Sequence, residues 1–187
     1  LIAFWKGLDI RTIGSGNIGA TNVGRALGKK WQFIVLLLDA LKGGSAVGIS
    51  KLIFIKNPAM PDIYIAIAPL LAGILAISGH NWTIFLKFKG GKGVSTTAGV
   101  IAFLSPFSIL VGLATYLLIT RVTRYVSLGS MLGAVAISIS IMLIHHSEKD
   151  SIYIQIFGIL ICLLVISRHK ENIKRLLKGE ETKIVRT

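Results

Sequence analysis

Long apolar runs separated by short polar segments dominate the sequence. After an apolar start at residues 1–4, further runs rich in Leu, Ile, Val, Ala and Gly cover residues 31–55, 63–78, 94–104, 106–120, 128–145 and 151–166. A helix that crosses a bilayer needs about 20 mostly apolar residues, fewer where it leans on its neighbours. The pattern predicts an all-α fold, a polytopic bundle of about seven membrane helices whose first is truncated here, forming one domain over residues 1–187.

The third and fourth runs, residues 94–104 and 106–120, are separated only by Ser105. The next run begins at Pro106, and proline removes a backbone donor and disfavours helix in the residue before it. These runs therefore form either a tight helical hairpin or one broken helix.

Basic residues gather on one side of this predicted topology. With the hairpin, one face receives every Lys and Arg except Lys42, Lys51, Lys56 and Lys149. Positive charge marks the cytoplasmic face of membrane proteins.

A net charge of +13 would indicate nucleic acid in a soluble protein. Here 53% hydrophobic residues and a mean hydropathy of +0.73 indicate a membrane protein, so topology and anionic lipid explain the charge and we expect no nucleic-acid partner. The segments assigned to the cytoplasmic face are 5–30, 79–93, 121–127 and the tail from 168.

A basic, glycine-rich segment, KFKGGKGVST, occupies residues 87–96 on that face. Gly90, Gly91 and Gly93 would let backbone N–H groups approach an anion closely, and Lys92 adds a full charge. The helix predicted to follow would direct its positive dipole end to the same place. The segment lacks the glycine and Ser/Thr positions of a Walker A loop. It therefore predicts a phosphate-binding loop of another kind.

Two further segments on the predicted cytoplasmic face suit phosphate. GSGNIGATNVGR at 14–25 formally matches a dinucleotide motif, but no strand precedes it and the acid at the right distance, Asp39, falls inside an apolar run. RHKENIKRLLKG at 168–179 is either a basic tail resting on headgroups or part of the site, with His169 and Asn172 on one helix face. Ser130 could face a site at the mouth of the bundle. The candidates in the first segment are Ser15, Gly16, Asn17, Thr21, Asn22 and Arg25.

Other polar residues in the apolar runs have simpler interpretations. Asp39 and Lys42, three residues apart, are expected to form an ion pair, since ionisable groups in lipid are costly unless paired; a proton relay is the alternative. Cys162 is the single cysteine and indicates neither a disulfide nor a metal cage. His145 and His146 are adjacent and poorly placed to bind one ion. We expect neither a metal site nor a cofactor.

Together these segments resemble the bacterial membrane acyltransferases that use acyl phosphate to acylate glycerol 3-phosphate, the PlsY family. SGNIGATNVGR is similar to the family's first motif, GHNWTIFLKFKGGKGV to its second and HKEN to its third. LLLDALKGG and RYVSLGS also resemble the family, in the right order. The resemblance covers nearly the whole chain. It departs from the family in the missing start of the first helix and in the loop KNPAMPD.

The resemblance implies a seven-helix enzyme of the bacterial inner membrane with its active site on the cytoplasmic face. It would make 1-acyl-glycerol 3-phosphate, that is lysophosphatidic acid, and inorganic phosphate, the first acylation of phospholipid synthesis. Its partners would be acyl phosphate, glycerol 3-phosphate and membrane lipid. By similarity, turnover needs Ser15 and Arg25, the loop 90–93 with Lys92 binds glycerol phosphate, Ser130 contributes to phosphate binding, and His169 and Asn172 complete the site.

The chemistry of an acyl phosphate fits these residues. Phosphate is a good leaving group, so the enzyme mainly has to hold two anions together and stabilise charge on the carbonyl. The predicted cytoplasmic face has neither the His-x4-Asp pair of other glycerolipid acyltransferases nor a Ser-His-Asp set. We therefore predict direct transfer without an acyl-enzyme, the hydroxyl proton passing to a substrate phosphate or, as second choice, to His169. The alternative is a transporter of organic phosphates. A transporter should show access from both faces, but the outer segments carry only Lys56 and Lys149 and no glycine motif.

Overall fold

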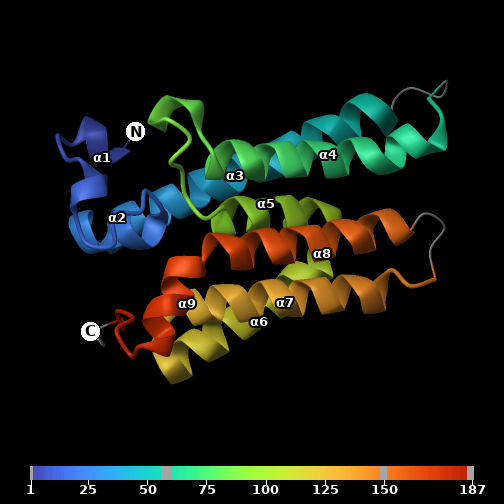
Figure 1. Cartoon of the computed structure of the whole chain (residues 1–187). Helices are drawn as coiled ribbons and strands as arrows, with labels where there is room; N and C mark the ends of the chain where they lie inside the picture. The colour runs from blue at the N-terminus through green and yellow to red at the C-terminus, as the bar shows by residue number, and fades with distance from the viewer. Residues whose placement is uncertain (1, 56–59, 148–150, 185–187) are drawn as a thin grey trace.

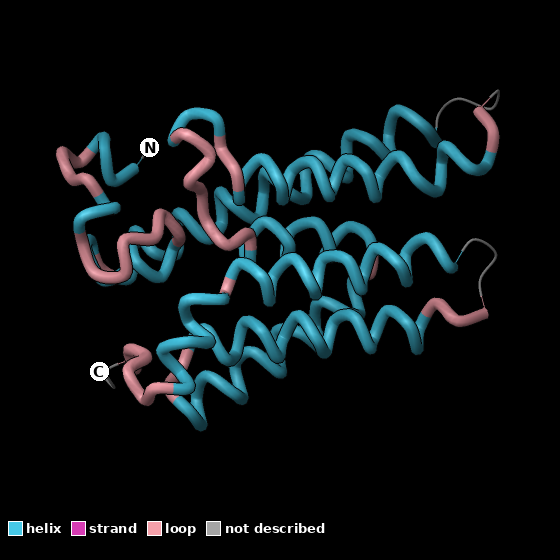
Figure 2. Tube along the Cα trace, in the orientation of Figure 1, coloured by secondary structure: helices cyan, strands magenta, loops and turns pink. Residues whose placement is uncertain are grey.

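The computed structural model of the chain describes residues 2–55, 60–147 and 151–184, so Lys56, Lys149 and Arg186 lie outside the described residues. Within these ranges the chain forms helices and loops and no strand (Figure 2). The all-α prediction is confirmed. The elements are α1 (Ile2–Trp5), the 3-10 turn η1 (Ile10–Thr12), α2 (Ala20–Leu27), α3 (Lys29–Ile55), α4 (Asp62–Asn81), the 3-10 turn η2 (Ile84–Leu86), α5 (Val94–Leu104), α6 (Pro106–Thr123), α7 (Val126–Ile144), α8 (Ser151–Arg168) and α9 (Lys170–Leu177).

The long helices lie alongside one another and form a bundle (Figure 1). In the described part of the chain five of them, α3, α4, α6, α7 and α8, are long and apolar enough to cross a membrane, and α5 is a shorter apolar helix. These six helices coincide with the six predicted runs to within a few residues at each end. Large apolar side chains such as Leu75 and Leu163 are exposed on the outside of the bundle, where lipid would cover them. The protein is a multi-pass membrane protein.

The chain reverses between α5 and α6, as the hairpin hypothesis predicted. Ser105 ends α5, and Pro106 is the first residue of α6, the helix position at which proline's missing N–H costs no hydrogen bond. The Ser105 hydroxyl lies 2.8 Å from that of Ser108 and 3.1 Å from Nε2 of His145. The start of α5 and the end of α6 therefore lie at the same end of the bundle (Figure 1).

Apolar side chains and glycines together close the centre of the bundle. Val47, Ile77, Val100 and Ile141 are fully buried in one core cluster. Membrane helices approach closely where a small residue stands at the contact. At Gly99 on α5, an added Cβ would collide with the backbone carbonyl of an α3 residue. This close approach brings α3 and α5 side by side.

One end of the bundle carries the connecting segments that the sequence analysis grouped together. α1, α2, the loop between α4 and α5, the turn between α6 and α7, α9 and the described tail all lie at this end, called the loop end below (Figure 1). Segments that are far apart in the sequence therefore meet in one place. A site that uses residues from several of these segments exists only when the chain is folded.

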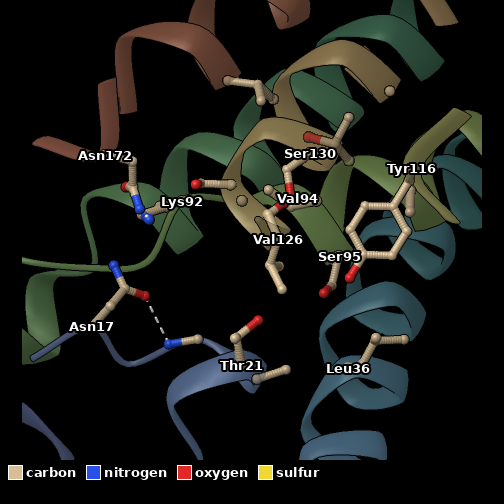
Figure 3. A pocket seen from close by; sticks show the side chains of 18 of the residues that line it. Asn17, Thr21, Leu36, Lys92, Val94, Ser95, Tyr116, Val126, Ser130 and Asn172 are labelled. Carbon is tan, nitrogen blue, oxygen red and sulfur yellow. Dashed lines mark hydrogen bonds between the residues drawn. The ribbon is translucent and has the colours of Figure 1, made fainter. Parts of the chain in front are cut away.

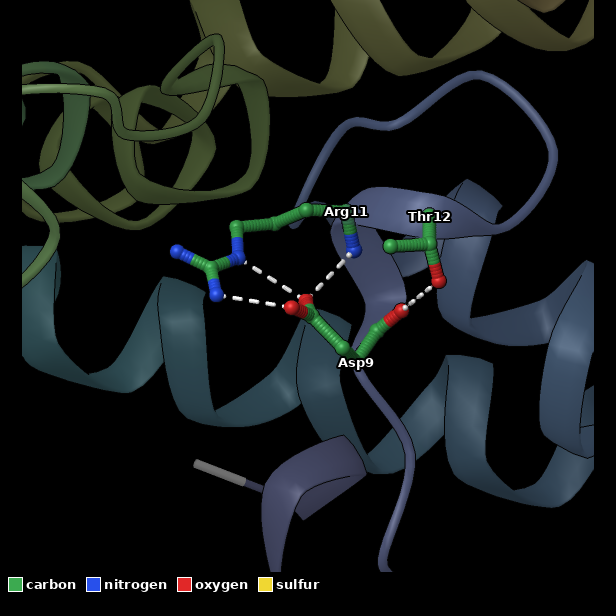
Figure 4. Close-up of polar contacts among 3 residues, drawn as sticks. All are labelled: Asp9, Arg11 and Thr12. Atoms are coloured by element: carbon green, nitrogen blue, oxygen red, sulfur yellow. Dashed lines mark hydrogen bonds and ion pairs between the residues drawn. The ribbon is translucent and has the colours of Figure 1, made fainter.

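An ion pair shapes the first segment of the loop end (Figure 4). Asp9 caps η1: its Oδ1 accepts hydrogen bonds from the Arg11 backbone N at 3.0 Å and from Arg11 Nε at 2.8 Å, and its Oδ2 accepts one from Nη2 at 2.7 Å. These bonds from Arg11 lower the pKa of Asp9 to about 2. The Thr12 hydroxyl donates to the Asp9 carbonyl at 2.9 Å. The pair is exposed, so its role is to fix the turn that leads into residues 14–25.

Replacing Gly99 by alanine should destabilise the bundle by about 1–3 kcal/mol, the typical cost of forcing extra atoms into a packed core. The added methyl group would push α5 away from α3. The measurement is the thermal unfolding midpoint in detergent. Gly79→Ala is the matched control, since a Cβ on this α4 glycine meets nothing within 4 Å. Equal midpoints for the two variants would contradict the packing.

Candidate functional site

A cavity of about 630 Å³ opens among the segments of the loop end (Figure 3). Its lining divides into two chemical halves. One half is polar and basic and includes Ser15, Arg25 and Lys92. The other is mainly apolar and includes Leu113 and Ile137, from the membrane helices. The cavity therefore suits a ligand with an anionic head and an apolar tail.

The segment 14–25 is held in shape by the amide of Asn22. This side chain is buried; its Nδ2 donates to the carbonyls of Ile10 at 3.1 Å and Ile13 at 2.8 Å, and its Oδ1 accepts from the Ser15 backbone N at 3.0 Å. Asn22 lines the cavity, but these bonds commit its amide to the loop. The effect is to present Ser15 to the cavity.

The start of α2 completes this wall. Asn17 Oδ1 accepts a hydrogen bond from the backbone N of Gly19 at 2.9 Å, seen in Figure 3, which fixes the chain just before the helix. Thr21 and Arg25 then line the cavity one turn apart on α2. One hydroxyl and one guanidinium are thereby directed at the same space.

Two glycines of the basic loop pack against the end of α4. Gly90 N donates to the Asn81 carbonyl at 3.2 Å, and Gly91 N donates to the His80 carbonyl at 3.1 Å. A Cβ on either glycine would collide with His80. Arg168 clamps the same turn, because its Nη2 donates to the carbonyls of Asn81 at 3.2 Å and Gly91 at 3.0 Å. The N–H groups of Gly90 and Gly91 therefore hold the loop in place. The close packing against α4 explains why the sequence has glycine at both positions.

The N-terminus of α5 faces the cavity. Gly93, with a φ of +74°, caps the helix without a side-chain hydrogen bond, and Val94 and Ser95 of the first turn line the cavity. N–H groups at a helix N-terminus have no partner within the helix and favour an anion. The buried hydroxyl of Thr97, one turn further on, also lines the cavity and has no hydrogen-bond partner among the described residues. The N–H groups of this helix end can donate hydrogen bonds to a phosphate or carbonyl oxygen.

Lys92 links the basic loop to α9. Its Nζ donates to Oδ1 of Asn172. Burial lowers the pKa of Lys92 to about 8, against the raising effect of the Glu181 carboxylate. Three guanidinium groups lower it further, those of Arg175, Arg25 and Arg168. An anion that binds beside a desolvated ammonium surrounded by other cations is strongly stabilised by electrostatic attraction.

His169 lies behind the cavity. It is only 2% exposed, and its Nδ1 bonds to the Val165 carbonyl at 2.8 Å, which makes Nδ1 the protonated nitrogen of the neutral ring. Burial, followed by the charge of Lys92, lowers the pKa of His169 to about 4. The ring is therefore neutral at physiological pH, at the start of α9 and within electrostatic reach of Lys92.

An ion-paired cluster closes the cavity on the side of α3 and α4. Lys42 Nζ lies 2.6 Å from both Oδ1 of Asp39 and Nδ1 of His80, and the Asp39 oxygen lies 3.4 Å from the same ring nitrogen. The predicted pair of Asp39 and Lys42 is confirmed, with His80 as a third member that the sequence did not indicate. Paired in this way, the three groups are tolerated near lipid.

Most of the residues singled out in the sequence meet at the cavity. Gly16, Gly90, Gly91 and His169 do not line it. Several residues that line the cavity are not among those predicted from the sequence, namely Ser95, Tyr116, Ser127, Arg175 and Glu181. Those predicted residues that do line it are Ser15, Asn17, Thr21, Asn22, Arg25, Lys92, Gly93, Ser130 and Asn172.

A membrane bundle with a basic, half-apolar cavity at its loop end defines a membrane protein that handles an anionic lipid or its precursor. Comparison with known proteins narrows this class. A family model described as glycerol-3-phosphate acyltransferase matches residues 1–179. The chain belongs to this acyltransferase family, and it is an acyltransferase of lipid biosynthesis.

Individual relatives agree over almost the full chain. The glycerol-3-phosphate acyltransferase of Desulforamulus reducens is 44% identical over 98% of this chain and 86% of its own length. That of Thermoanaerobacter sp. is 42% identical over 97% of this chain and 84% of its own. Among solved structures, the glycerol 3-phosphate form of PlsY (YgiH), an integral membrane glycerol 3-phosphate acyltransferase, matches with a TM-score of 0.84 and 36% identity, covering 98% of this chain and 86% of that one. The lysophosphatidic acid form matches with a TM-score of 0.82 and 35% identity.

The buried His169 predicts a specific pH dependence of stability. Its folded pKa, about 4, lies below the ordinary 6.5, so the unfolded chain binds more protons between these values and the folded state is favoured as pH rises. The unfolding free energy should gain up to about 3 kcal/mol between pH 4 and 6.5 from this group. Thermal unfolding of native protein and His169→Gln across this range measures the difference. His146→Gln, at an exposed position, is the control and should keep the native slope. Parallel curves for native protein and His169→Gln would contradict the assignment.

Proposed function

We propose that this enzyme transfers a fatty acyl group from acyl phosphate to the 1-hydroxyl of glycerol 3-phosphate, giving lysophosphatidic acid and inorganic phosphate. The observation that carries the proposal is the contact of Lys92 with Asn172 at the basic end of a cavity whose other wall is apolar. It joins the glycine-rich loop to α9 and concentrates positive charge at a single place. Membership of the acyltransferase family supports the reaction type.

Glycerol 3-phosphate is proposed to bind at the basic end, through Lys92, Arg25 and Asn172, with Ser15 beside them. Two solved structures of a related protein are described as its glycerol 3-phosphate and lysophosphatidic acid forms, which supports a site for this substrate and product. We propose a supporting role for Gly90 and Gly91, which place the loop, and for His169, which packs beneath it. Gly16 shapes the first segment.

Acyl phosphate is proposed to bind with its phosphate near Ser130 and the N-terminus of α5, and its chain along the apolar wall. Leu36, Leu113 and Tyr116 line that wall and belong to helices that cross the membrane. A donor already dissolved in the bilayer could enter from the side with its tail in lipid. Holding the two substrates side by side then contributes most of the rate, because transfer becomes effectively intramolecular.

The transfer is proposed to be direct. The C1 oxygen of glycerol 3-phosphate bonds to the acyl carbon, the bond from that carbon to the phosphate oxygen breaks, and the hydroxyl proton passes to a phosphate oxygen. Two serines of the cavity bond to groups other than a histidine: the hydroxyl of Ser130 donates to the Val126 carbonyl and that of Ser127 to Glu181. His169 does not line the cavity, and burial lowers the pKa of its ring to about 4, which favours phosphate over histidine as the proton acceptor. Arg25 and the α5 amides would stabilise charge on the carbonyl oxygen.

The site is proposed to lie on the cytoplasmic face of the bacterial inner membrane. The loop end carries the basic residues that mark this face in other membrane proteins. A cysteine introduced at Lys178, in a background where Cys162 is serine, tests the assignment. It should react with an impermeant reagent in inside-out vesicles and stay protected in right-side-out ones.

Activity is tested with purified protein in detergent, acyl phosphate and labelled glycerol 3-phosphate. Labelled lysophosphatidic acid and free phosphate should form together. A covalent acyl-serine trapped by mass spectrometry would overturn direct transfer. Uptake of glycerol 3-phosphate into liposomes without product would instead support the transporter hypothesis.

In the same assay Lys92→Ala should raise the KM for glycerol 3-phosphate about 10- to 100-fold, as expected for the loss of a charge-assisted bond worth about 1.5–3 kcal/mol. The KM for acyl phosphate should change less. Lys89→Ala is the matched control, an exposed lysine three residues away in the same loop, and should behave like native enzyme. An unchanged KM in Lys92→Ala would count against the assigned substrate contact.

A further inference from the structure

The tail beyond α9 folds back across the loop end. Gly179 turns the chain with a φ of +72°, and Ile184 N then donates to the Arg124 carbonyl at 3.0 Å, in the turn between α6 and α7. Lys183 lies over the ring of Tyr125, with Nζ 5.4 Å from its centroid. Residues 180–184 therefore form a strap that connects α9 to the start of α7 along one edge of the cavity.

The strap brings one carboxylate into the basic half of the cavity. Glu181 Oε1 accepts from Ser127 Oγ at 2.6 Å and from Asn172 Nδ2 at 2.6 Å, while Oε2 accepts from Arg175 Nε at 2.7 Å. Its side chain is 7% exposed. Burial raises the pKa of Glu181, but the hydrogen bonds from Ser127, Asn172 and Arg175 outweigh this and hold the pKa below its ordinary value. The group is an ionised carboxylate with three donors, which is a built contact and differs from a free tail resting on the surface.

This carboxylate decides how the amide of Asn172 is oriented. An amide has one donor end and one acceptor end. Because Nδ2 donates to Glu181, Oδ1 is left to face the ammonium of Lys92. Without the carboxylate the amide could rotate and point its NH2 group at the lysine, which would repel it. Glu181 thus acts on Lys92 through Asn172.

The same carboxylate also offsets the positive charge around Lys92. The charged groups that act on this ammonium are the guanidinium groups of Arg25 on α2, Arg168 on α8 and Arg175 on α9, and the carboxylate of Glu181 in the strap. The imidazole of His169 also packs nearby and is neutral at physiological pH. Removing Glu181 would leave the buried ammonium facing three cations, so its proton would be lost at a lower pH.

We propose that Glu181 is a positioning residue for glycerol 3-phosphate: it holds Asn172 and Arg175 in their binding orientation and offsets the positive charge around Lys92. This assignment rests on the proposed function. The family match ends at residue 179, before Glu181, so the contacts of the carboxylate carry the argument. The alternative is that the Glu181 carboxylate occupies these donors in place of a substrate phosphate and weakens the binding of glycerol 3-phosphate; the same experiment distinguishes the two.

The test compares Glu181→Gln, Glu181→Asp and native enzyme by kcat and by the KM for glycerol 3-phosphate from pH 6 to 9. Glu181→Gln should raise this KM about tenfold at pH 8, as for one lost charge-assisted bond, with a smaller change in kcat. Its alkaline rise in KM should begin about one pH unit below that of native enzyme. Glu181→Asp keeps the charge and should keep the alkaline rise near its native position. Glu180→Gln is the matched control, an exposed neighbour in the same strap, and should match native enzyme.

Other outcomes overturn the assignment. A lower KM in Glu181→Gln at all pH values would show a competing anion. An equal KM increase in Glu181→Gln and Glu181→Asp, without a shift of the alkaline rise, would show a purely structural role. If Glu181→Gln does not fold, Ser127→Ala removes one of the three bonds and should raise the KM about threefold; an unchanged KM there would overturn the proposal. Failure of the proposed function is distinct, because native enzyme would then form no product, and the same variants would be compared by calorimetric binding of glycerol 3-phosphate.

Discussion

The buried ammonium of Lys92 is the constraint on which the rest of the site depends. A charge taken out of water is costly unless hydrogen bonds and opposite charges compensate, and here the compensation comes from Asn172 on α9 and Glu181 in the strap. The compensation is incomplete, because three arginines lie near the same group. The basic end of the cavity therefore keeps an excess of positive charge, which favours the binding of an anion.

The surrounding structure holds the segments that carry these charges in fixed positions. Asn22 uses its whole amide to hold the first segment, and Arg168 holds the glycine-rich turn against the end of α4. The cluster of Asp39, Lys42 and His80 keeps two helices together where they border the cavity. Preorganised donors of this kind are the main source of electrostatic catalysis. The apolar wall on the other side connects the same site to the bilayer.

The sequence predicts the membrane helices well because their apolar runs are long and proline and glycine mark their limits; even the short helix at 94–104 follows from the proline after it. The motifs also predict which segments meet at the cavity. Individual roles depend on tertiary contacts that no local pattern contains. The N–H of Gly90 donates to a carbonyl at the end of α4, and the ring of His169 bonds to the Val165 carbonyl. Glu181 accepts a hydrogen bond from Ser127, 54 residues away. An acid in a basic tail, next to a second glutamate at position 180, gives no sequence signal of such a partner.

We infer from the contact of Lys92 with Asn172 that the glycine-rich loop and α9 form one anion site. A double-mutant cycle of Lys92→Ala and Asn172→Ala, measured by calorimetric binding of glycerol 3-phosphate in detergent, tests it most directly. Residues that act together on one ligand show coupling energies of about 0.5–3 kcal/mol, and the account predicts coupling of about 1 kcal/mol or more. Losses that simply add would mean that the two residues bind independently, and would contradict the account.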